Sequence, residues 1–541
     1  MTARDREDVR WYLEDYLQYP VDPAPDIAAR VESKLAELGA ELFRLVFEAD
    51  RDTMRLWDAI AGSLSDCRVE VATGPEGAAG LPWELLRDPA TDGVLALRAG
   101  AFVRVLAEAS GPVAVPEVPK TLRVLLVICR PGGRVDVPFR SVASHLVRLS
   151  RAARDAFQLD VLRPPTFAAL TQALQAAKAQ GEPYHVVHFD GHGAWLGRDA
   201  VAAGIAGGVD RDRFSLLSPP RPGSHGYLVF EDPSTNENQL LVDGPALGQL
   251  LADADVPVLV LNACRSAHAD LLTAPEPEAA DLGAHQRVRA YGSLAQEVMD
   301  AGVAGVVAMA YNVYVVTAAR FIGEVYAGLL AGRELGQAVA AARRQLAASP
   351  LRQVVMEPRP LQDWLVPMVF EAAPLALRAA HEAQPGLAID LSQGEAGRER
   401  AHLDPAFVAE PDVGFFGRDE TLLALDRAFD AEQVVLLHAW AGAGKTSTAL
   451  EFARWYALTG AVERVLFTSF TRHLPLVRLL DQIGDRFGPA LAAAGVEWAI
   501  LDDAKRRSVA LQVLTQVKVL WVWDNVEPVA GFPAGTPSTW T

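Results

Sequence analysis

Apolar residues between positions 120 and 375 follow two alternating patterns. Short, almost wholly apolar runs at Leu122–Cys129, Tyr184–Phe189 and Val256–Asn262 indicate buried strands of a parallel sheet. Between them, stretches such as Thr166–Gln180 carry apolar residues at helical spacing. Strands that alternate with helices imply a sheet covered by helices on both faces. We therefore predict an α/β fold with a mostly parallel sheet and flanking helices.

The same patterns predict further elements and a division of the chain. Further strands are predicted at Arg68–Thr73, Ala101–Ala107, Gln158–Leu162, Gly226–Glu231, Ala304–Ala310, Trp364–Phe370, Gln433–His438 and Val517–Asp524. Further helices are predicted at Pro245–Asp253 (capped by Asp243), Leu294–Ala301, Thr317–Leu330, Leu335–Ala347, Glu420–Phe429 and Ser447–Tyr456. We predict a helical and strand region at 1–115 that packs on the core, the core at 116–375, a linker at 376–411, and a partial second α/β unit at 412–541.

Composition and charge restrict the class of protein. The formal net charge of −18 would repel phosphate-rich partners, so neither nucleic acid nor a membrane surface is expected to bind. The first residues are charged and include no apolar core of a secretory signal, and no stretch of about 18 apolar residues is free of charge. The three cysteines form no C-x-x-C, which argues against a zinc ribbon or a disulfide framework. We expect a cytoplasmic protein with reduced thiols.

A histidine and a cysteine each follow a predicted strand. His192 lies between two glycines, Gly191 and Gly193, just after one apolar run, and this pattern predicts a sharp turn. Cys264 directly follows the run that ends at Asn262. Because open α/β sheets bind ligands at the carboxyl ends of their strands, parallel neighbours would bring His192 and Cys264 together there.

This pair of residue types is suited to nucleophilic catalysis. A free thiol has a pKa near 8.5 and is mostly protonated at neutral pH, so it needs a base. An adjacent imidazole activates the thiol and later protonates the leaving amine. The oxyanion also needs donors, and the backbone N–H groups of Gly193 and Cys264 are our candidates.

Both segments resemble signatures of one protein family. His188–Gly193 is similar to H-x-x-GHG and Asn262–Ala267 to N-A-C-x-S-A, the motifs of CHAT domains, a branch of the caspase and separase fold. Pro82–Leu86, Ser293–Ala295 and Ala318–Leu346 also resemble that family, so the resemblance covers roughly residues 60–375. It implies a caspase-like, mostly parallel sheet and a cysteine peptidase with a two-residue dyad, often coupled to regulatory modules.

Other interpretations of these residues remain open. Cys264 could be a small buried hydrophobic residue. His185, His188 and His192 could bind a metal, although His185 and His188 would point to opposite faces of a strand. Asp190 could orient His192, face the substrate, or only stabilise the turn.

Two long stretches flank the predicted dyad. Leu196–His225 is irregular and rich in Gly, Pro, Arg and Asp, and Asp270–Ala290 is acidic and rich in Pro and Ala. Loops of this length inside a compact domain are either functional lids and binding loops or plain excursions of the chain.

A second motif indicates nucleotide binding. The segment Ala439–Thr446 follows an apolar run and precedes a predicted helix, which is the context of a phosphate-binding P-loop. Lys445 would contact the β- and γ-phosphates and the Thr446 hydroxyl would bind Mg²⁺. Ala439 occupies the position of the usual first glycine. The remaining residues predicted to contact the nucleotide from this loop are Gly442, Ala443, Gly444 and Ser447.

Two further segments resemble STAND and NB-ARC-like ATPases. Val517–Asp524 is an apolar run that ends in an acid, like a Walker B strand whose Asp524 acts on Mg²⁺. Glu527 is the candidate for a hydrolytic base. Phe415-Phe416-Gly417-Arg418 resembles the F-x-G-R entry of that family, where the backbone near the glycine approaches adenine, and Phe416, Gly417 and Arg418 are predicted to contact the nucleotide. The resemblance implies ATP or ADP with Mg²⁺ as ligand, and a family member would continue beyond Thr541 with lid and sensor parts.

These observations predict a caspase-like cysteine endopeptidase that acts on polypeptides without a cofactor and is regulated by an ATP-binding STAND switch. Self-association or a sensor segment beyond Thr541 is the expected regulatory partner, and analogy suggests bacterial defence or regulated cell death. One alternative is a signalling NTPase whose CHAT domain is a non-catalytic interaction module. Another is a cysteine amidohydrolase or transferase that acts on small amides.

Overall fold

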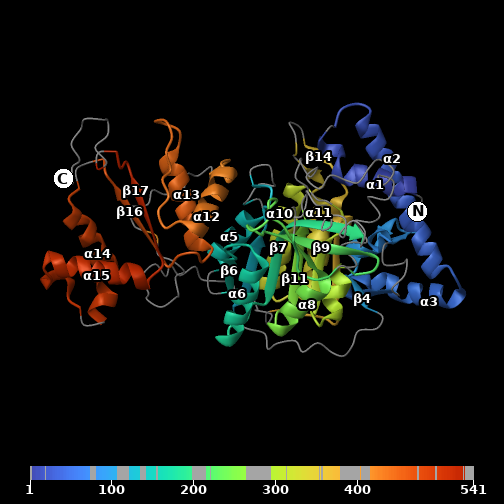
Figure 1. Cartoon of the computed structure of the whole chain (residues 1–541). Helices are drawn as coiled ribbons and strands as arrows, with labels where there is room; N and C mark the ends of the chain where they lie inside the picture. Colours follow the sequence, from blue (N-terminus) through green and yellow to red (C-terminus); the bar gives the residue numbers. More distant parts are fainter. Residues whose placement is uncertain are drawn as a thin grey trace, which may run out of the picture. The chain divides into compact units, whose positions relative to one another are not determined.

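The computed structural model describes most of the chain. The described residues are 3–18, 20–73, 81–106, 121–133, 140, 142–153, 156–197, 215–219, 221–263, 294–311, 314–352, 354, 358–377, 403, 415–471, 474–493, 496–527 and 529. The chain divides into two compact units, Met1–Ile389 and Asp390–Thr541 (Figure 1). Most of the predicted linker at 376–411 lies outside the described residues, and the predicted domain boundaries stay predictions.

The first unit is built around one large, mixed sheet. Eleven described strands form it, in the order β1-β4-β15-β12-β11-β7-β9-β10-β8, with β5 between β6 and the first half of β7. Only the pairs β12–β15, β7–β9 and β9–β10 are antiparallel, which confirms the predicted α/β fold with a mostly parallel sheet. The strands are β1 (Arg68–Thr73), β4 (Ala101–Leu106), β5 (Leu122–Ile128), β6 (Phe157–Val161), β7 (Val186–Gly197), β8 (Ser215–Leu216), β9 (Ser224–Phe230), β10 (Leu240–Asp243), β11 (Val258–Ala263), β12 (Gly305–Met309) and β15 (Pro367–Glu371).

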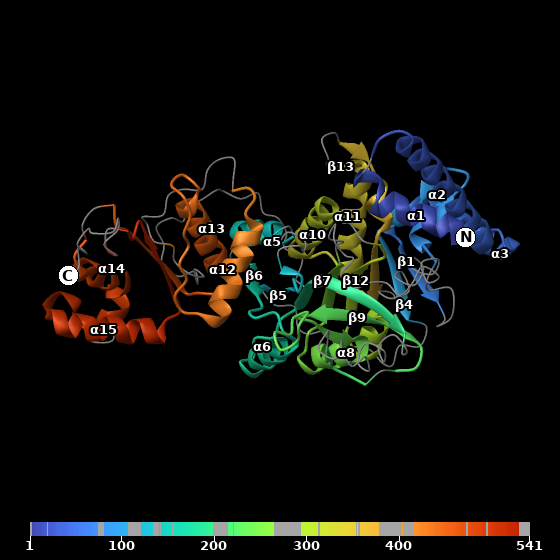
Figure 2. The ribbon, with the colours of Figure 1, turned by 45° about the horizontal axis from the view of Figure 1, so that its top comes forward.

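Helices cover both faces of this sheet. In both views α10 and α11 lie on one side of β7 and β9, and α8 lies on the other (Figure 1 and Figure 2). The helices that follow the N-terminal region are α4 (Leu95–Arg98), α5 (Ala143–Ala152), α6 (Phe167–Ala179), α8 (Gly244–Asp253), the helical residues 294–300, α10 (Val315–Leu330) and α11 (Leu335–Ala348). As predicted, the Asp243 side chain caps α8 by accepting a hydrogen bond from the backbone N–H of Ala246. Among the described residues, no helix combines the length and apolar character needed to cross a membrane.

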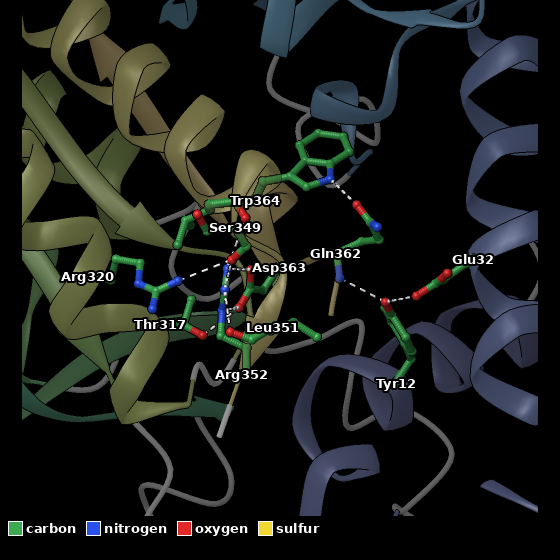
Figure 3. Close-up of polar contacts among 11 residues, drawn as sticks. Tyr12, Glu32, Thr317, Arg320, Ser349, Leu351, Arg352, Gln362, Asp363 and Trp364 are labelled. Atoms are coloured by element: carbon green, nitrogen blue, oxygen red, sulfur yellow. Dashed lines mark hydrogen bonds and ion pairs between the residues drawn. The ribbon is translucent and has the colours of Figure 1, made fainter. Parts of the chain in front are cut away.

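The N-terminal helices pack against the end of the unit that carries β13 (Leu351–Arg352) and β14 (Arg359–Pro360). They are α1 (Ala3–Glu14), α2 (Ala24–Phe47) and α3 (Arg51–Ile60), with the 3₁₀ helices η1 (Tyr16–Gln18) and η2 (Ala61–Asp66) between and after them. The buried Tyr12 hydroxyl on α1 donates to Glu32 on α2 and accepts from the backbone N–H of Gln362 at 2.8 Å (Figure 3). This hydroxyl therefore links both helices to the core of the unit.

A buried ion pair joins β13 to the 3₁₀ helix η8 (Asp363–Leu365). Arg352 donates from Nε and from a terminal nitrogen to the two carboxylate oxygens of Asp363, each over 2.7 Å. The hydroxyl of Thr317 on α10 donates to the same carboxylate (Figure 3). The pair is buried, and it is not part of the predicted active site.

The Pro82–Leu86 segment contains a second buried ionic contact. Glu84 accepts from two nitrogens of Arg104 on β4, at 3.1 and 2.7 Å, and lies 3.7 Å from Arg343 on α11. Arg343 also donates to the backbone oxygens of Phe102 and Pro367, and its burial lowers its pKa to about 10. Two of the segments that suggested the family are thus joined inside the fold. Glu84 belongs to the 3₁₀ helix η4 (Trp83–Leu85), which is followed by the short antiparallel strands β2 (Arg87–Asp88) and β3 (Gly93–Val94).

The second unit contains a two-stranded parallel sheet and its helices. Its elements are α12 (Asp419–Ala431), α13 (Lys445–Leu458), β16 (Arg464–Ser469), α14 (Leu476–Ala493), η9 (Trp498–Ile500), α15 (Asp503–Gln516) and β17 (Val519–Asp524). The strand predicted at Gln433–His438 is not formed. Among the described residues of this unit only β16 and β17 pair, and Val434 and Leu436 are 88% and 72% exposed.

Two other predictions of local structure are corrected by the fold. The turn predicted at Gly191–Gly193 is absent, because β7 continues without interruption to Gly197 and pairs there with β9. The strand predicted at Trp364–Phe370 begins only at Pro367, after η8.

Candidate active site

The parallel register of β7 and β11 pairs Gly191, which precedes His192, with Ala263, which precedes Cys264. Each paired residue on β11 is numbered 72 above its partner on β7, from Val258 and Val186 to Ala263 and Gly191. The difference between Cys264 and His192 is also 72. The described part of β11 ends at Ala263, so Cys264 itself lies outside the described residues.

His192 lies where β7 changes its partners. Up to Gly191 the strand is paired with β11 and up to Asp190 with β5, whereas His192 is paired with Val229 of the antiparallel strand β9. Gly191 fits here because a Cβ would come within 2.9 Å of the Phe189 ring. His192 is partly buried, so its ring lies at a boundary between the packed sheet and the surface.

The predicted oxyanion donor Gly193 lies inside the extended strand, paired with Leu228 of β9. Its role stays a prediction, as does that of the Cys264 backbone.

A layer of buried polar side chains is centred on Asp190, two residues before His192 on β7. Arg130, which follows β5, donates to the backbone oxygen of Asp190 at 2.7 Å and to its carboxylate at 2.9 Å. Asn262 on β11 donates to the other carboxylate oxygen at 3.2 Å. All three side chains are almost wholly inaccessible, and Glu231 accepts from the backbone N–H of Arg130 at 2.8 Å. Asp190 therefore joins three strands.

Two other histidines have packing roles: His188 on β7, and His185, which directly precedes that strand. His188 is fully buried on the face covered by α10, where its Nδ1 lies 3.2 Å from the Tyr326 hydroxyl, and burial lowers its pKa to about 3. Burial and the nearby Arg123 lower the pKa of His185 to about 4, and its Nδ1 accepts from the Arg123 backbone N–H. The part of the chain that the structure describes contains no group of three or more His, Cys, Asp or Glu placed to hold a metal ion.

Of the two flanking stretches, Leu196–His225 is described at 196–197, 215–219 and 221–225, and Asp270–Ala290 lies wholly outside the described residues. Residues 198–214 and 264–293 lie outside the described residues. At the described ends, Arg221 donates with both terminal nitrogens to Glu297, at 3.1 and 3.0 Å, and His225 Nδ1 lies 3.1 Å from the same carboxylate. Glu297, on the helix 294–300, therefore holds both Arg221, which precedes β9, and His225, which lies at the start of β9.

In the second unit, the segment predicted to be a phosphate loop bends at two glycines before α13. Gly442 and Gly444 have φ values of 75° and 81°, in the left-handed region that glycine adopts without strain. Lys445 is the first residue of α13, and its Nζ donates to the backbone oxygens of Ala439 and Trp440 at 3.1 and 3.3 Å. That this segment, with Ala439 in its first position, binds phosphate stays a prediction.

The two residues predicted to act on Mg²⁺ meet in the fold. Thr446 Oγ1 donates to Asp524 at 2.8 Å, from the start of α13 to the end of β17. Arg418, with φ of 58° after Gly417 at 73°, donates to the Ala443 backbone oxygen at 2.6 Å. Of the remaining predicted residues, Ser447 and Phe416 are exposed, Phe416 by 80%.

The sequence reasoning missed Arg130. It follows an apolar strand without any motif, and only the sheet order reveals that the end of β5 lies beside Asp190. Arg221 and Glu297 were missed for a similar reason, because 76 residues separate them.

The mostly parallel central sheet with flanking helices is that of an α/β protein and fits a caspase-like fold. The profile of the CHAT domain family matches residues 68–404, which is more than half of the chain, so the protein belongs to the CHAT domain family. CHAT domains are a family of caspase-like cysteine peptidases. No curated protein matches the chain.

Proposed function

We propose that the first unit is a cysteine endopeptidase in which His192 and Cys264 form the catalytic dyad. One observation carries this proposal: the side chains of Asp190 and Asn262, a registered pair of β7 and β11, are hydrogen-bonded across the strands. Side chains two residues apart on a strand share a face, and neighbouring strands are about 4.8 Å apart. We propose that β11 continues past Ala263 in the same register, so that Cys264 would follow Asn262 on that face as His192 follows Asp190 on β7.

The chemistry follows from that neighbourhood. The imidazole of His192 removes the thiol proton, and the Cys264 sulfur forms a bond to the carbonyl carbon of a peptide. Collapse of the tetrahedral adduct breaks the C–N bond, and the imidazolium gives its proton to the leaving amine. Water then hydrolyses the thioester with His192 again as base. The Gly193 and Cys264 backbone N–H groups are the proposed oxyanion donors.

We further propose that the second unit binds ATP or ADP with Mg²⁺ and that this binding regulates the peptidase, as a STAND switch would. The oxygen donors Thr446 and Asp524 suit Mg²⁺, and they already lie within hydrogen-bond distance of each other. Lys445, the Gly442–Gly444 backbone and the start of α13 would hold the phosphates. The bound nucleotide would contribute its phosphate charge, which these residues recognise.

The peptidase proposal is tested by cleavage of a peptide library. Full-length protein loaded with ATP and Mg²⁺ is compared with Cys264→Ala, and with Cys67→Ala as a control at a cysteine that is partly buried beside β1. We expect the Cys264 variant to lose cleavage and the Cys67 variant to retain it. Cleavage that survives Cys264→Ala would remove this residue from the mechanism, whereas no cleavage by the wild-type protein would favour a non-catalytic CHAT module.

A further inference from the structure

Three buried polar residues meet where the pairing of β7 with β5 and with β11 ends. All residues of β5 except Arg123, and most positions of the first half of β7 and of β11, are apolar and buried. Arg130, Asp190 and Asn262 interrupt that pattern together, each 2% exposed or less. Asp190 lies two residues before His192 on β7, and Asn262 lies two residues before Cys264. The polar layer is therefore next to the proposed dyad in the sequence.

Stability alone does not explain a charged pair at this depth. Removing two ions from water costs free energy that their attraction often fails to recover, and apolar residues of similar volume are frequently as stable. The best-attested use of such buried polar groups is to select one register. The contacts here have that form, since Asn262 and Asp190 are direct partners in the β7–β11 ladder.

Register matters here because one residue of slippage changes which groups meet. A shift by one position would move the side chains of a strand to the opposite face and would place a glycine beside Cys264. Arg130 adds a second constraint. It donates to the Asp190 backbone oxygen, which also accepts from the Cys129 N–H at 3.0 Å, and so fixes the peptide that leads into Gly191 and His192.

We infer that Arg130, Asp190 and Asn262 are positioning residues, which set the register of β7 against β11 and thereby bring the imidazole of His192 to the thiol of Cys264. This inference rests on the proposed peptidase function. The three residues act through the strands, and none of them is assigned contact with substrate.

The test is the pH dependence of Cys264 alkylation by iodoacetamide in the full chain, quantified on the peptide that contains Cys264 so that Cys67 and Cys129 do not contribute. Asn262→Leu removes the cross-strand hydrogen bond and keeps the ion pair. We expect its rate near pH 6.5 to fall by roughly tenfold or more and its profile to approach that of His192→Ala, because small misplacements of reacting groups have large effects.

Thr317→Val is the matched control. It also removes one neutral hydrogen bond to a carboxylate in a buried Arg–Asp pair, that of Arg352 and Asp363. Its alkylation profile should equal that of the wild type. If Asn262→Leu does not fold, Arg130→Lys replaces it, since lysine keeps the charge but loses the simultaneous bonds to the Asp190 carboxylate and backbone oxygen. We expect an intermediate profile.

The outcomes separate the two claims. Profiles of Asn262→Leu and Arg130→Lys that match the wild type, while His192→Ala differs, would overturn the positioning role and leave the dyad in place. A His192→Ala profile equal to that of the wild type would overturn the dyad itself. A shift in Thr317→Val as large as in Asn262→Leu would show a general effect of destabilisation and would also overturn the positioning role.

Discussion

At the scale of single residues, His188 illustrates how burial decides protonation. Its ring is fully inaccessible, its Nδ1 faces the Tyr326 hydroxyl, and its Nε2 has no hydrogen-bond partner. A charged imidazolium would be poorly solvated there, so the folded protein keeps the ring neutral and its pKa falls to about 3. The same motif therefore contains one histidine suited to packing and, four residues later, one at the surface boundary.

The sign of the resulting pH dependence follows from linkage. Between the pKa of the unfolded chain, 6.5, and the folded value of about 3, the unfolded chain binds a proton that the folded protein does not. The free energy of unfolding must therefore fall as pH falls below 6.5. From pH 7 to pH 5 we expect His188 to remove about 2 kcal/mol.

Urea unfolding of the full chain at both pH values measures this loss, with His188→Gln as the comparison. The variant keeps a polar side chain beside Tyr326 but cannot take up the proton. Its first-unit transition should be less sensitive to pH than that of the wild type by about the same amount. Equal sensitivity of the two proteins would mean that His188 is protonated in the folded state.

Residue-level predictions succeeded where a local rule decides the outcome. Asp243 caps α8 because an acceptor before a proline-initiated helix satisfies free N–H groups. Thr446 and Asp524, taken from two local sequence patterns, lie within hydrogen-bond distance of each other, but their role on Mg²⁺ stays a prediction. Arg130 could not be predicted, because its partner depends on the order of strands in the sheet.

At the scale of elements, the contact between α2 and the segment before β2 is close. At Gly39, in the middle of α2, an added Cβ would lie 2.1 Å from the backbone oxygen of Leu85 and 3.1 Å from Arg87 Cβ. A backbone oxygen cannot rotate away as the end of a flexible side chain can. The helix can therefore approach this segment only with glycine at this position.

Gly39→Ala should lower the stability of the first unit, although alanine is the better helix former. We expect a loss of about 1–3 kcal/mol from overpacking, measured by urea unfolding. Gly62→Ala is the control, because nothing lies within 4 Å of its Cβ position, and its effect should stay within about 1 kcal/mol. A Gly39 variant as stable as the Gly62 variant would contradict the close packing of α2.

Most elements of the first unit could be predicted from periodicity, with ends displaced by a few residues. The errors have physical causes. Gly191 and Gly193 suggested a turn, but β7 needs small residues where it passes Phe189 and changes from β5 and β11 to β9. The apolar run at Gln433–His438 suggested a strand, yet a strand requires a hydrogen-bonded neighbour, and the described residues provide none for it.

At the scale of the whole molecule, the chain combines a CHAT unit with a second unit for which we propose a phosphate loop. If that loop binds nucleotide, its Lys445 must leave the backbone oxygens it now contacts and turn to the phosphates. We expect Lys445→Ala to weaken the binding of ATP with Mg²⁺ by roughly tenfold or more, because charge-assisted hydrogen bonds are lost. Calorimetric titration of the full chain measures this change.

Lys505→Ala serves as the control in the same unit, since this exposed lysine pairs with Asp502 on α15. Its affinity for ATP should equal that of the wild type. Asp524→Ala keeps Lys445, so this variant should still bind ATP, but its affinity for ATP should no longer depend on Mg²⁺. Equal affinities of the Lys445 and Lys505 variants would contradict a phosphate site in this loop.

The central claim is that residues 192 and 264 are neighbours on one face of adjacent strands, and disulfide trapping tests it most directly. In a Cys67→Ser background, His192→Cys is oxidised and the peptides are identified by mass spectrometry. Neighbouring strands about 4.8 Å apart lie within the Cα separation that a disulfide spans, so residues 192 and 264 should be cross-linked rapidly. Gly193→Cys, on the opposite face, should be cross-linked much more slowly; equal trapping from position 193, or none from position 192, would contradict the dyad.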